Sequence, residues 1–281
     1  YIWAIFWKNS FLEYEYFGRF FYVYLYITSI FLIADNLNLK SIFYKILLIL
    51  FFIIITFEPY LLAGYQEYLI FSSLIIAARY ISFFDFKSSK NYKFIFLILM
   101  ILYLNCWFKD EGLFYFIIFS SLFILMINLS NQSKFTFLFF ITFLLLIQYM
   151  LQKYIIGIYD FPEKISLTDI IFDITNFEIL IIKLSKISFH IFVAFAKYSL
   201  WIVILISIFI KIFFKQKFNI IERYFSMCLL FNLIFLIGIF FTFKNLDFML
   251  RVSLDRLIFQ TSGFYLMLIL LTLDNLKIFK K

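Results

Sequence analysis

The sequence predicts an all-α protein, a polytopic membrane helix bundle, and three observations lead to this fold class. Hydrophobic residues make up 65% of the 281 positions, which is more apolar surface than a water-soluble domain can bury. These residues form long runs separated by short polar segments, and roughly 17–25 apolar residues suffice to cross a bilayer as a helix. Only 6 Gly and 2 Pro interrupt the pattern, so helices are expected throughout.

The apolar runs predict about nine membrane-spanning helices. Their expected ranges are 19–34, 41–57, 60–84, 93–108, 112–128, 135–151, 189–214, 224–242 and 257–273. Neither an internal repeat nor a Gly/Ser-rich linker divides the chain, so residues 1–281 are expected to form a single transmembrane domain. The chain opens at Tyr1 in mid-pattern, without the layout of a signal peptide. We therefore expect a fragment that lacks an N-terminal span and the first outer loop.

The charged residues predict the orientation of these helices. Basic residues gather in alternate loops, at Lys40, Lys45, Lys87, Lys90, Lys93, Lys134, Lys211, Lys215, Lys217, Arg223, Lys277, Lys280 and Lys281. Most acidic residues fall in the opposite set of loops. By the positive-inside rule, the basic loops and the C-terminus are cytoplasmic. The net charge of +8 therefore reflects orientation in a bilayer, and no nucleic-acid partner is expected. The cytoplasmic halves of the helices look almost featureless.

One connection, 152–188, is long and is expected to lie outside the membrane on the extracytoplasmic face. Within it, Thr168 or Asp169 can cap a helix whose acids recur beside Ile and Phe. This pattern predicts an amphipathic helix lying in the outer interface. Two interpretations stay open, a structural flap or a lid over a lipid-facing cleft.

The turn from Lys109 to Gly112 places three charges between two apolar runs. Lys109 ends one helix, and Asp110 and Glu111 begin the next, as helix dipoles favour in a simple hairpin cap. Ionisable side chains close to the hydrocarbon are costly, however, and tend to face the bundle interior. The turn is therefore either a cap or part of a site.

Glu67 is a second candidate on the outer side. If its helix starts at Pro59, the carboxylate lies about 12 Å along the helix axis and needs a partner or a water-filled cleft. If Gly64 breaks the segment, Glu67 is a first-turn acid.

A third stretch, Arg251 to Arg256, leads into the last span. Arg251 and Asp255 are four residues apart, which favours a surface ion pair on a helix. Arg256 begins the final apolar run on the outer side, where a guanidinium can bind a phosphate bidentately or reach lipid headgroups.

The remaining polar residues favour structural roles. His190 favours a structural hydrogen bond, Arg79 a contact with lipid headgroups, and Cys106 and Cys228 buried thiols without a disulfide. Glu13 and Glu15 form either an exposed pair or a site for a divalent cation. The sequence has no P-loop and no HExxH motif, which argues against an ATP-driven pump.

Three elements together resemble the bacterial multi-pass glycosyltransferases of the GT-C superfamily. They are Gly64-Tyr65-Gln66-Glu67, Lys109-Asp110-Glu111-Gly112 and Ser253-Leu254-Asp255-Arg256-Leu257. The resemblance covers roughly residues 58–120 and 245–270, and the order of the elements agrees with the topology inferred from charge. In that superfamily the catalytic acid usually lies in the first outer loop. That loop would precede Tyr1, unless Glu13 or Glu15 takes its place.

The resemblance implies an enzyme of the bacterial cytoplasmic membrane that acts at the extracytoplasmic face. It would move a sugar from a polyprenyl-phosphate-linked donor to a lipid, glycan or protein acceptor. Glu67 and Glu111 are then candidate catalytic acids or ligands of a divalent cation. Lys109, Asp110, Arg251 and Arg256 are candidate contacts for the substrate and its phosphate.

Two other functions stay open. A transporter or flippase of a lipid-linked glycan would place polar residues through both halves of the bundle, whereas one half here looks featureless. A surface-glycan polymerase or ligase would be expected to carry Arg and His in its long loop, and 152–188 has neither.

Overall fold

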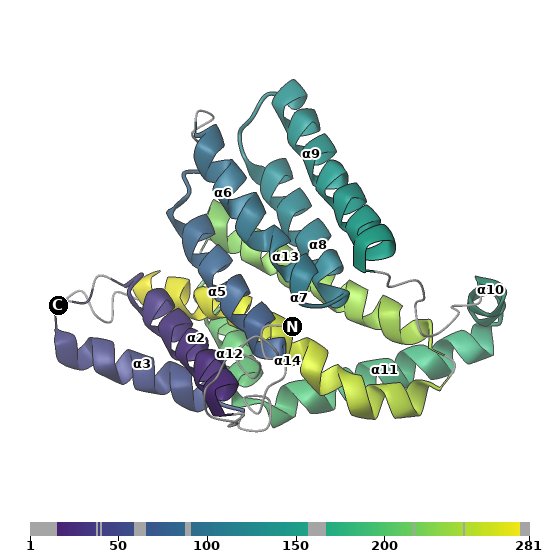
Figure 1. Cartoon of the computed structure of the whole chain (residues 1–281). Helices are drawn as coiled ribbons and strands as arrows, with labels where there is room; N and C mark the ends of the chain where they lie inside the picture. The colour runs from purple at the N-terminus through teal and green to yellow at the C-terminus, as the bar shows by residue number, and fades with distance from the viewer. Residues whose placement is uncertain are drawn as a thin grey trace.

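The computed structural model describes residues 16–37, 39, 41–58, 66–87, 91–156, 167–215, 217–243 and 245–275. Over these residues the protein is all-helical, without strands, which confirms the predicted fold class (Figure 1). The helices are α2 (Tyr16–Ala34), α3 (Ile42–Thr56), α5 (Glu67–Phe83), α6 (Tyr92–Tyr103), α7 (Asn105–Phe108), α8 (Glu111–Met126), α9 (Asn131–Met150), α10 (Leu167–Thr175), α11 (Phe177–Lys197), α12 (Ser199–Phe213), α13 (Ile220–Phe241) and α14 (Leu246–Asn275), with a π-helical turn at Leu151–Ile156. The predictions for Glu13, Glu15, Pro59 and Gly64 lie outside the described residues.

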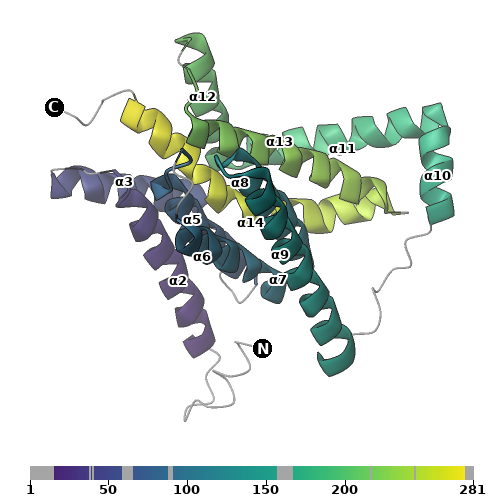
Figure 2. The same cartoon turned by 90° about the horizontal axis from the view of Figure 1, so that it is seen from above.

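Four helices, α9, α11, α13 and α14, are long and apolar enough to cross a membrane by length and composition. Five shorter apolar stretches of helix in the described part of the chain have 10–17 residues each, namely Phe20–Ala34, Ile42–Thr56, Tyr92–Phe108, Glu111–Met126 and Ser199–Phe213. These helices indicate a membrane protein, while the nine crossings and the placement of α10 in the interface stay predictions. α10 itself lies at the edge of the molecule, where Lys183 of α11 forms an ion pair with Asp173 at 2.6 Å (Figures 1 and 2).

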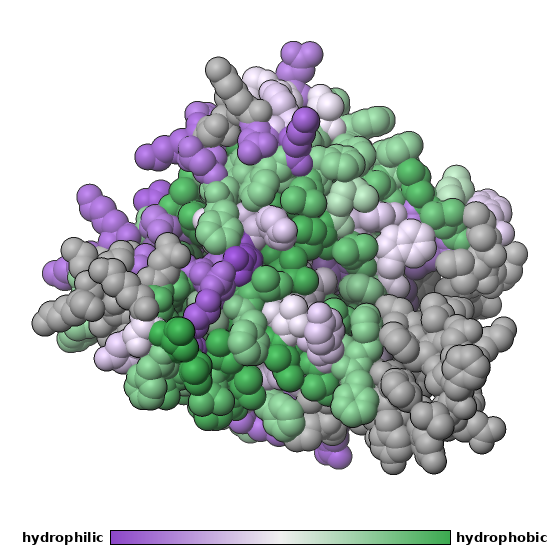
Figure 3. All heavy atoms as spheres, turned by 60° about the vertical axis from the view of Figure 1, so that its left-hand side comes forward, coloured by the Kyte–Doolittle hydropathy of each residue, from purple (hydrophilic) through white to green (hydrophobic). Residues whose placement is uncertain are grey.

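Large apolar side chains cover the outward faces of several helices. On α9, Phe135 and Phe139 are 72% and 66% exposed, and Phe189 and Phe192 are similarly exposed on α11. Figure 3 shows broad apolar areas of this kind, with hydrophilic side chains gathered toward the edges of the view. Soluble monomers rarely expose contiguous apolar patches of more than a few hundred Å², so these faces suit lipid.

The core is built on the packing of α14 against α5. Both helices are buried along most of their length, and α5 carries polar residues that the other helices cover. Gly263 permits a close approach, because a Cβ at this position would lie 2.8 Å from the carbonyl oxygen of Phe71. The rings of Phe71 and Phe259 stack across the same interface, with centroids 4.9 Å apart.

Three predicted spans differ from the helices in the structure. The range 93–108 is divided at Leu104 into α6 and α7, and 189–214 is divided at Tyr198, whose backbone is extended. In the range 60–84, the described helix starts only at Glu67. α11 also begins inside the expected loop 152–188, at Phe177, and its Lys183 and Lys186 form ion pairs with Asp173 and Asp247. An apolar run predicts where a helix can form, but it does not reveal that one residue within the run, such as Tyr198, has an extended backbone.

The helix ends collect in two groups at opposite ends of the bundle. In one group, Asp35 pairs with Lys45 and Arg79. The hydrogen bond from Lys45 has the largest effect on the pKa of Asp35, the bond from Arg79 has the next largest, and both lower this pKa. The backbone of Asn128 also donates to the carbonyl of Phe86 in this group, at 3.0 Å. The other group contains the helix ends that carry Glu67 and Glu111, the first residues of α5 and α8. This division agrees with the alternation of charge, while the assignment of one end to the cytoplasm stays a prediction.

Candidate functional site

Three of the predicted site residues meet at one end of the bundle. Glu67, the first residue of α5, is 0% exposed. Its Oε1 accepts a hydrogen bond from Lys109 Nζ at 2.6 Å. The same oxygen accepts one from Arg256 Nε at 2.6 Å, and Arg256 Nη2 lies 2.5 Å away. We refer to Glu67, Lys109 and Arg256 as the charge triad. The two cations lie 42 and 189 positions from Glu67 in the sequence, so the fold brings three distant segments together.

Helix α7 and its turn into α8 hold Lys109 in place. The helix is joined to α5 by a hydrogen bond from Ser73 Oγ to Asn105 Oδ1 at 2.5 Å. Gly112 packs directly on the other side of α7, because a Cβ there would lie 2.0 Å from the carbonyl oxygen of Asn105. The glycine of the charged turn thus permits the close approach of α7 and α8. As a result, Lys109 emerges from the end of α7 facing α5.

Within the triad, one carboxylate stands between two cations, so these three side chains together carry a charge of +1. Arg256 also has a further interaction beyond the triad. The side chains of Lys109 and Arg256 are 19% and 32% exposed, whereas Glu67 is inaccessible. An anion can therefore approach the two cations from the surface. Guanidinium and ammonium groups form strong charge-assisted hydrogen bonds with phosphate oxygens.

A structural role accounts for only part of this arrangement. A buried carboxylate needs a partner, because an uncompensated charge in the interior is strongly destabilising. A single cation would satisfy that need, yet two cations share Oε1. The other oxygen, Oε2, is buried and has no hydrogen-bond partner in the described part of the chain. The carboxylate therefore holds Lys109 and Arg256 side by side on one oxygen, which is more than its own burial requires.

The other predicted site residues do not join the triad. Glu111 is half-buried in the first turn of α8, and Asp110 is exposed without a side-chain capping bond. Arg251 is exposed, and Asp255 pairs with Lys197 at 2.7 Å in place of the expected pair with Arg251. Among the described residues, no group of three or more His, Cys, Asp or Glu side chains could hold a metal ion. The divalent cation stays a prediction.

Polar contacts continue inward from Arg256 along α14. Gln260, one turn after Arg256, accepts a hydrogen bond from the hydroxyl of Tyr115 at 2.9 Å. Thr261 accepts one from Asn232 of α13 at 3.0 Å. In the sequence, a lone amide or hydroxyl within an apolar run indicates such a contact, since buried polar groups require hydrogen-bond partners.

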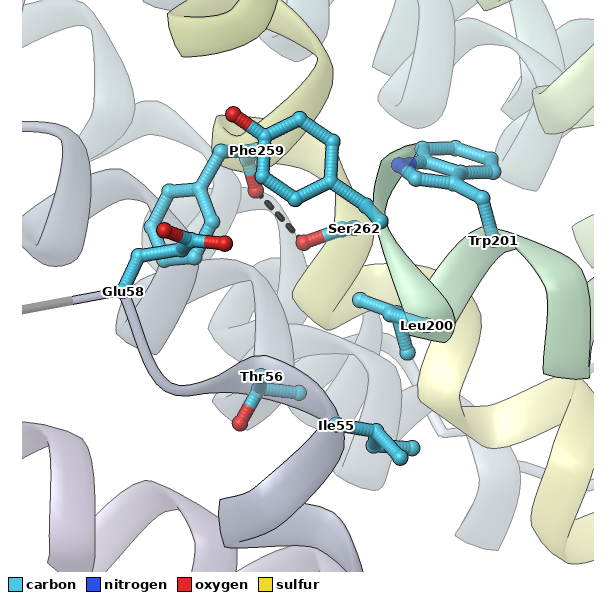
Figure 4. Close-up of a pocket in the computed structure, with 8 residues that line it drawn as sticks. Ile55, Thr56, Glu58, Leu200, Trp201, Phe259 and Ser262 are labelled. Atoms are coloured by element: carbon cyan, nitrogen blue, oxygen red, sulfur yellow. Dashed lines mark hydrogen bonds between the residues drawn. The ribbon is translucent and has the colours of Figure 1, made fainter. Parts of the chain in front are cut away.

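A cleft lies beside the triad. It is lined by Ile55, Thr56, Glu58, Tyr198, Leu200, Trp201, Phe259 and Ser262 (Figure 4). The ring of Phe259 packs against that of Tyr68, with centroids 4.8 Å apart. Tyr68 follows Glu67 in the chain, so the triad and the cleft share this aromatic wall.

The opposite half of the bundle contains a buried ion pair, contrary to the expectation of a featureless half. Lys211 and Glu222 pair across the turn between α12 and α13, with side chains 3% and 1% exposed. Glu222 also accepts a hydrogen bond from the backbone of Asn219 at 2.9 Å, as part of a capping box. The sequence showed these two charges as loop residues, whereas the hairpin turns them inward toward each other.

Comparison of the sequence with models of known protein families found no match, and comparisons with curated proteins and with solved structures found none either. The resemblance to the GT-C superfamily therefore depends on the three sequence elements alone.

Proposed function

We propose that this protein is a membrane glycosyltransferase that moves a sugar from a polyprenyl-phosphate-linked donor to a hydroxyl group of a lipid, glycan or protein. The observation that carries this proposal is the meeting of Glu67, Lys109 and Arg256 at one end of the bundle. Each of these residues comes from a different one of the three elements that resemble the GT-C superfamily.

The charge triad suits the leaving group of this reaction. When the bond between the sugar and the phosphate breaks, negative charge develops on the phosphate oxygens. Cations held in advance at that position stabilise the transition state more than they stabilise the bound donor. Lys109 and Arg256 supply those cations, and Glu67 holds them side by side. Glu67 is then a positioning residue, because its bound oxygen is a poor proton acceptor.

The membrane supplies the donor. Exposed apolar faces on α9 and α11 allow a polyprenyl chain to approach the bundle from within the bilayer. The triad end would face the extracytoplasmic side of the bacterial cytoplasmic membrane, with the C-terminus in the cytoplasm. α10 would lie in the outer interface as a flap or a lid near the lipid entrance.

Substitution of each cation tests the proposal. The variants Lys109→Ala and Arg256→Ala should bind farnesyl phosphate about 10–100-fold more weakly in detergent micelles, because each loses a charge-assisted hydrogen bond. Binding of farnesol, which lacks the phosphate, should not change. Lys186→Ala is the matched control, since Lys186 pairs with Asp247 on the surface. Transfer of labelled sugar from a panel of polyprenyl-phosphate sugars should fall in parallel. Unchanged affinity and transfer in both variants would exclude the phosphate site.

A transporter of lipid-linked glycans is the second candidate, and the polar residues beyond the triad favour it. The buried pair of Lys211 and Glu222 places charges in the half that the sequence showed as apolar, and the contact of Asn232 with Thr261 places polar groups inside the bundle. Reconstituted vesicles distinguish the two functions. A transporter moves a labelled lipid-linked sugar across the bilayer intact, whereas a transferase releases polyprenyl phosphate.

A further inference from the structure

The cleft beside the charge triad is small and mostly apolar, with Thr56, Glu58 and Ser262 as its polar lining residues. Its enclosed volume is about 10 Å³, roughly the space of one water molecule. The cleft therefore admits only a group the size of a hydroxyl from a larger ligand. Figure 4 shows Glu58 and Trp201 on opposite sides of it, with Ser262 between them. Such a lining suits a hydroxyl group carried on an apolar or sugar carbon.

Glu58 differs from Glu67 in that its carboxylate is available. The backbone of Glu58 is held by Tyr68, whose hydroxyl accepts from its N–H at 3.1 Å and donates to its carbonyl oxygen at 3.2 Å. Its side-chain oxygens form neither an ion pair nor a hydrogen bond with any residue that the structure describes. Both lone-pair regions of the carboxylate can therefore accept a proton or a hydrogen bond from a ligand.

The surroundings of Glu58 also make it a better base than an exposed carboxylate. Burial raises the pKa of Glu58 above the usual range for a glutamate, and the nearby charge of Asp255 acts in the same direction. The positive charge of Lys197 lowers the pKa of Glu58, but its effect is smaller than that of burial. The other titratable neighbours are the phenols of Tyr68 and Tyr198. A carboxylate with a raised pKa takes up a proton more readily in general base catalysis.

The cleft and the triad are connected through neighbouring residues of α14 and α5. Phe259 lines the cleft and follows Arg256 on α14 by about one turn. Tyr68 contacts Glu58 on one side of the aromatic wall, and its chain neighbour Glu67 binds the two cations on the other. A donor whose phosphate contacts the cations would present its sugar toward this wall and toward the cleft beyond it.

We propose that Glu58 is the catalytic base of the transfer and that the cleft binds the hydroxyl-bearing end of the acceptor. This inference rests on the proposed function. The acceptor hydroxyl gives its proton to Glu58, and its oxygen forms a bond with the anomeric carbon of the sugar. The bond from that carbon to the phosphate oxygen breaks, and the electron pair leaves on the phosphate beside Lys109 and Arg256.

The variant Glu58→Gln tests this role while keeping the size of the side chain and the backbone bonds to Tyr68. Sugar transfer from the panel of polyprenyl-phosphate sugars should fall about 100–10,000-fold, the usual contribution of a general base. Affinity for farnesyl phosphate and the melting temperature in detergent should stay at the wild-type values. Asp247→Asn serves as the control, because Asp247 is an exposed carboxylate on α14 away from the cleft.

The dependence of the rate on pH gives a second test. Below the raised pKa of Glu58 the base is protonated, so the wild-type rate should fall with a midpoint above the usual glutamate range. In Glu58→Gln this acidic limb should disappear, and the residual rate should be flat over the same interval. A structural role for Glu58 would lower the rate without removing the limb.

The outcomes separate this inference from the proposed function. If the wild type transfers sugar and Glu58→Gln stays within about threefold of it, well below the contribution of a general base, Glu58 is not the base and the function stands. If the wild type transfers no sugar from any donor of the panel, the proposed function is wrong and this role falls with it. Loss of transfer together with loss of farnesyl phosphate affinity in Glu58→Gln also contradicts the assignment, because a base is not required for donor binding.

Discussion

At the scale of single residues, the surroundings of a carboxylate decide what it can do. Glu58 and Glu67 lie close together in the chain and at the same end of the bundle. The side chain of Glu58 forms no ion pair within the described residues, whereas Glu67 is shared by two cations. The sequence pointed to Glu67, Lys109 and Arg256 through charge in apolar surroundings and through resemblance. It did not show which groups would be paired, because the partners lie up to 189 positions apart. Glu58 is recognisable as a candidate base only from the cleft that it lines.

Removal of the negative charge from the triad should destabilise the protein. In Glu67→Gln, two cations face each other without the carboxylate that joined them. We expect a loss of about 1–3 kcal/mol in the free energy of unfolding, since each hydrogen bond to a charged group contributes in this range and both cations are partly solvated. Thermal unfolding in detergent measures the change. Asp247→Asn, which breaks an exposed pair, should shift the melting temperature very little, and equal shifts in the two variants would contradict a stabilising role for Glu67.

At the scale of helices, close approach is set by glycines in particular places. Gly112 and Gly263 each lie against the backbone of a neighbouring helix, whereas a Cβ at Gly238 would meet nothing within 4 Å. The sequence identifies Gly112 as part of a short turn. That this position must lack a side chain is evident only from α7, which packs against it. The same limit applies to the breaks at Leu104 and Tyr198. Hydrophobic runs predicted the helices there, and only packing showed where they divide.

Alanine substitutions at two glycines should have opposite effects. Gly112→Ala forces α7 and α8 apart, because the new Cβ would lie 2.0 Å from the carbonyl oxygen of Asn105. We expect a loss of about 1–3 kcal/mol, the usual cost of overpacking, together with weaker farnesyl phosphate binding as Lys109 moves. Gly238→Ala should instead stabilise α13 by about 0.5–1 kcal/mol, because alanine is the better helix former and has open space. Unfolding in detergent compares the two, and a stable Gly112→Ala variant with wild-type binding would contradict this packing.

The hairpin of α12 and α13 depends on the buried pair of Lys211 and Glu222. Either single substitution by methionine leaves one charge buried without its partner and should cost about 3–5 kcal/mol. The double variant removes both charges and should recover most of that loss, so a double-mutant cycle should show coupling of more than about 1 kcal/mol. Surface expression and unfolding in detergent provide the readouts. Additive losses in the double variant would mean that the two charges act independently.

At the scale of the whole molecule, the two groups of helix ends define two faces. Alternating loop charge predicted this division, and the contacts of Asp35 at one end and Glu67 at the other agree with it. Charge patterns can predict such a division because they depend on loop order and not on detailed packing, while the side of the membrane that each end faces stays a prediction. The number of crossings stays a prediction, since an apolar helix such as α5 can be enclosed by other helices instead of facing lipid.

Cysteine labelling can assign the two faces. Asp110 and Lys87 are both exposed and lie at opposite ends of the bundle, so Asp110→Cys should react with an impermeant maleimide in intact cells. Lys87→Cys should react only after the membrane is permeabilised, because the basic loops are expected in the cytoplasm. The wild-type chain is the control, since Cys106 and Cys228 are both buried. The reverse pattern would invert the topology and place the triad in the cytoplasm.

The burial of α14 has a consequence for how the protein is made. It is the last described helix to leave the ribosome, yet α5, α11, α12 and α13 all pack against it. Until it enters the membrane, the earlier helices lack their common partner, and Glu67 has only one of its two cations. Biogenesis must therefore hold a set of inserted but loosely associated helices, within the translocon or beside an insertase. We expect nascent chains that stop before α14 to be recognised by membrane proteases, because the helices made earlier then lack the partner that encloses them.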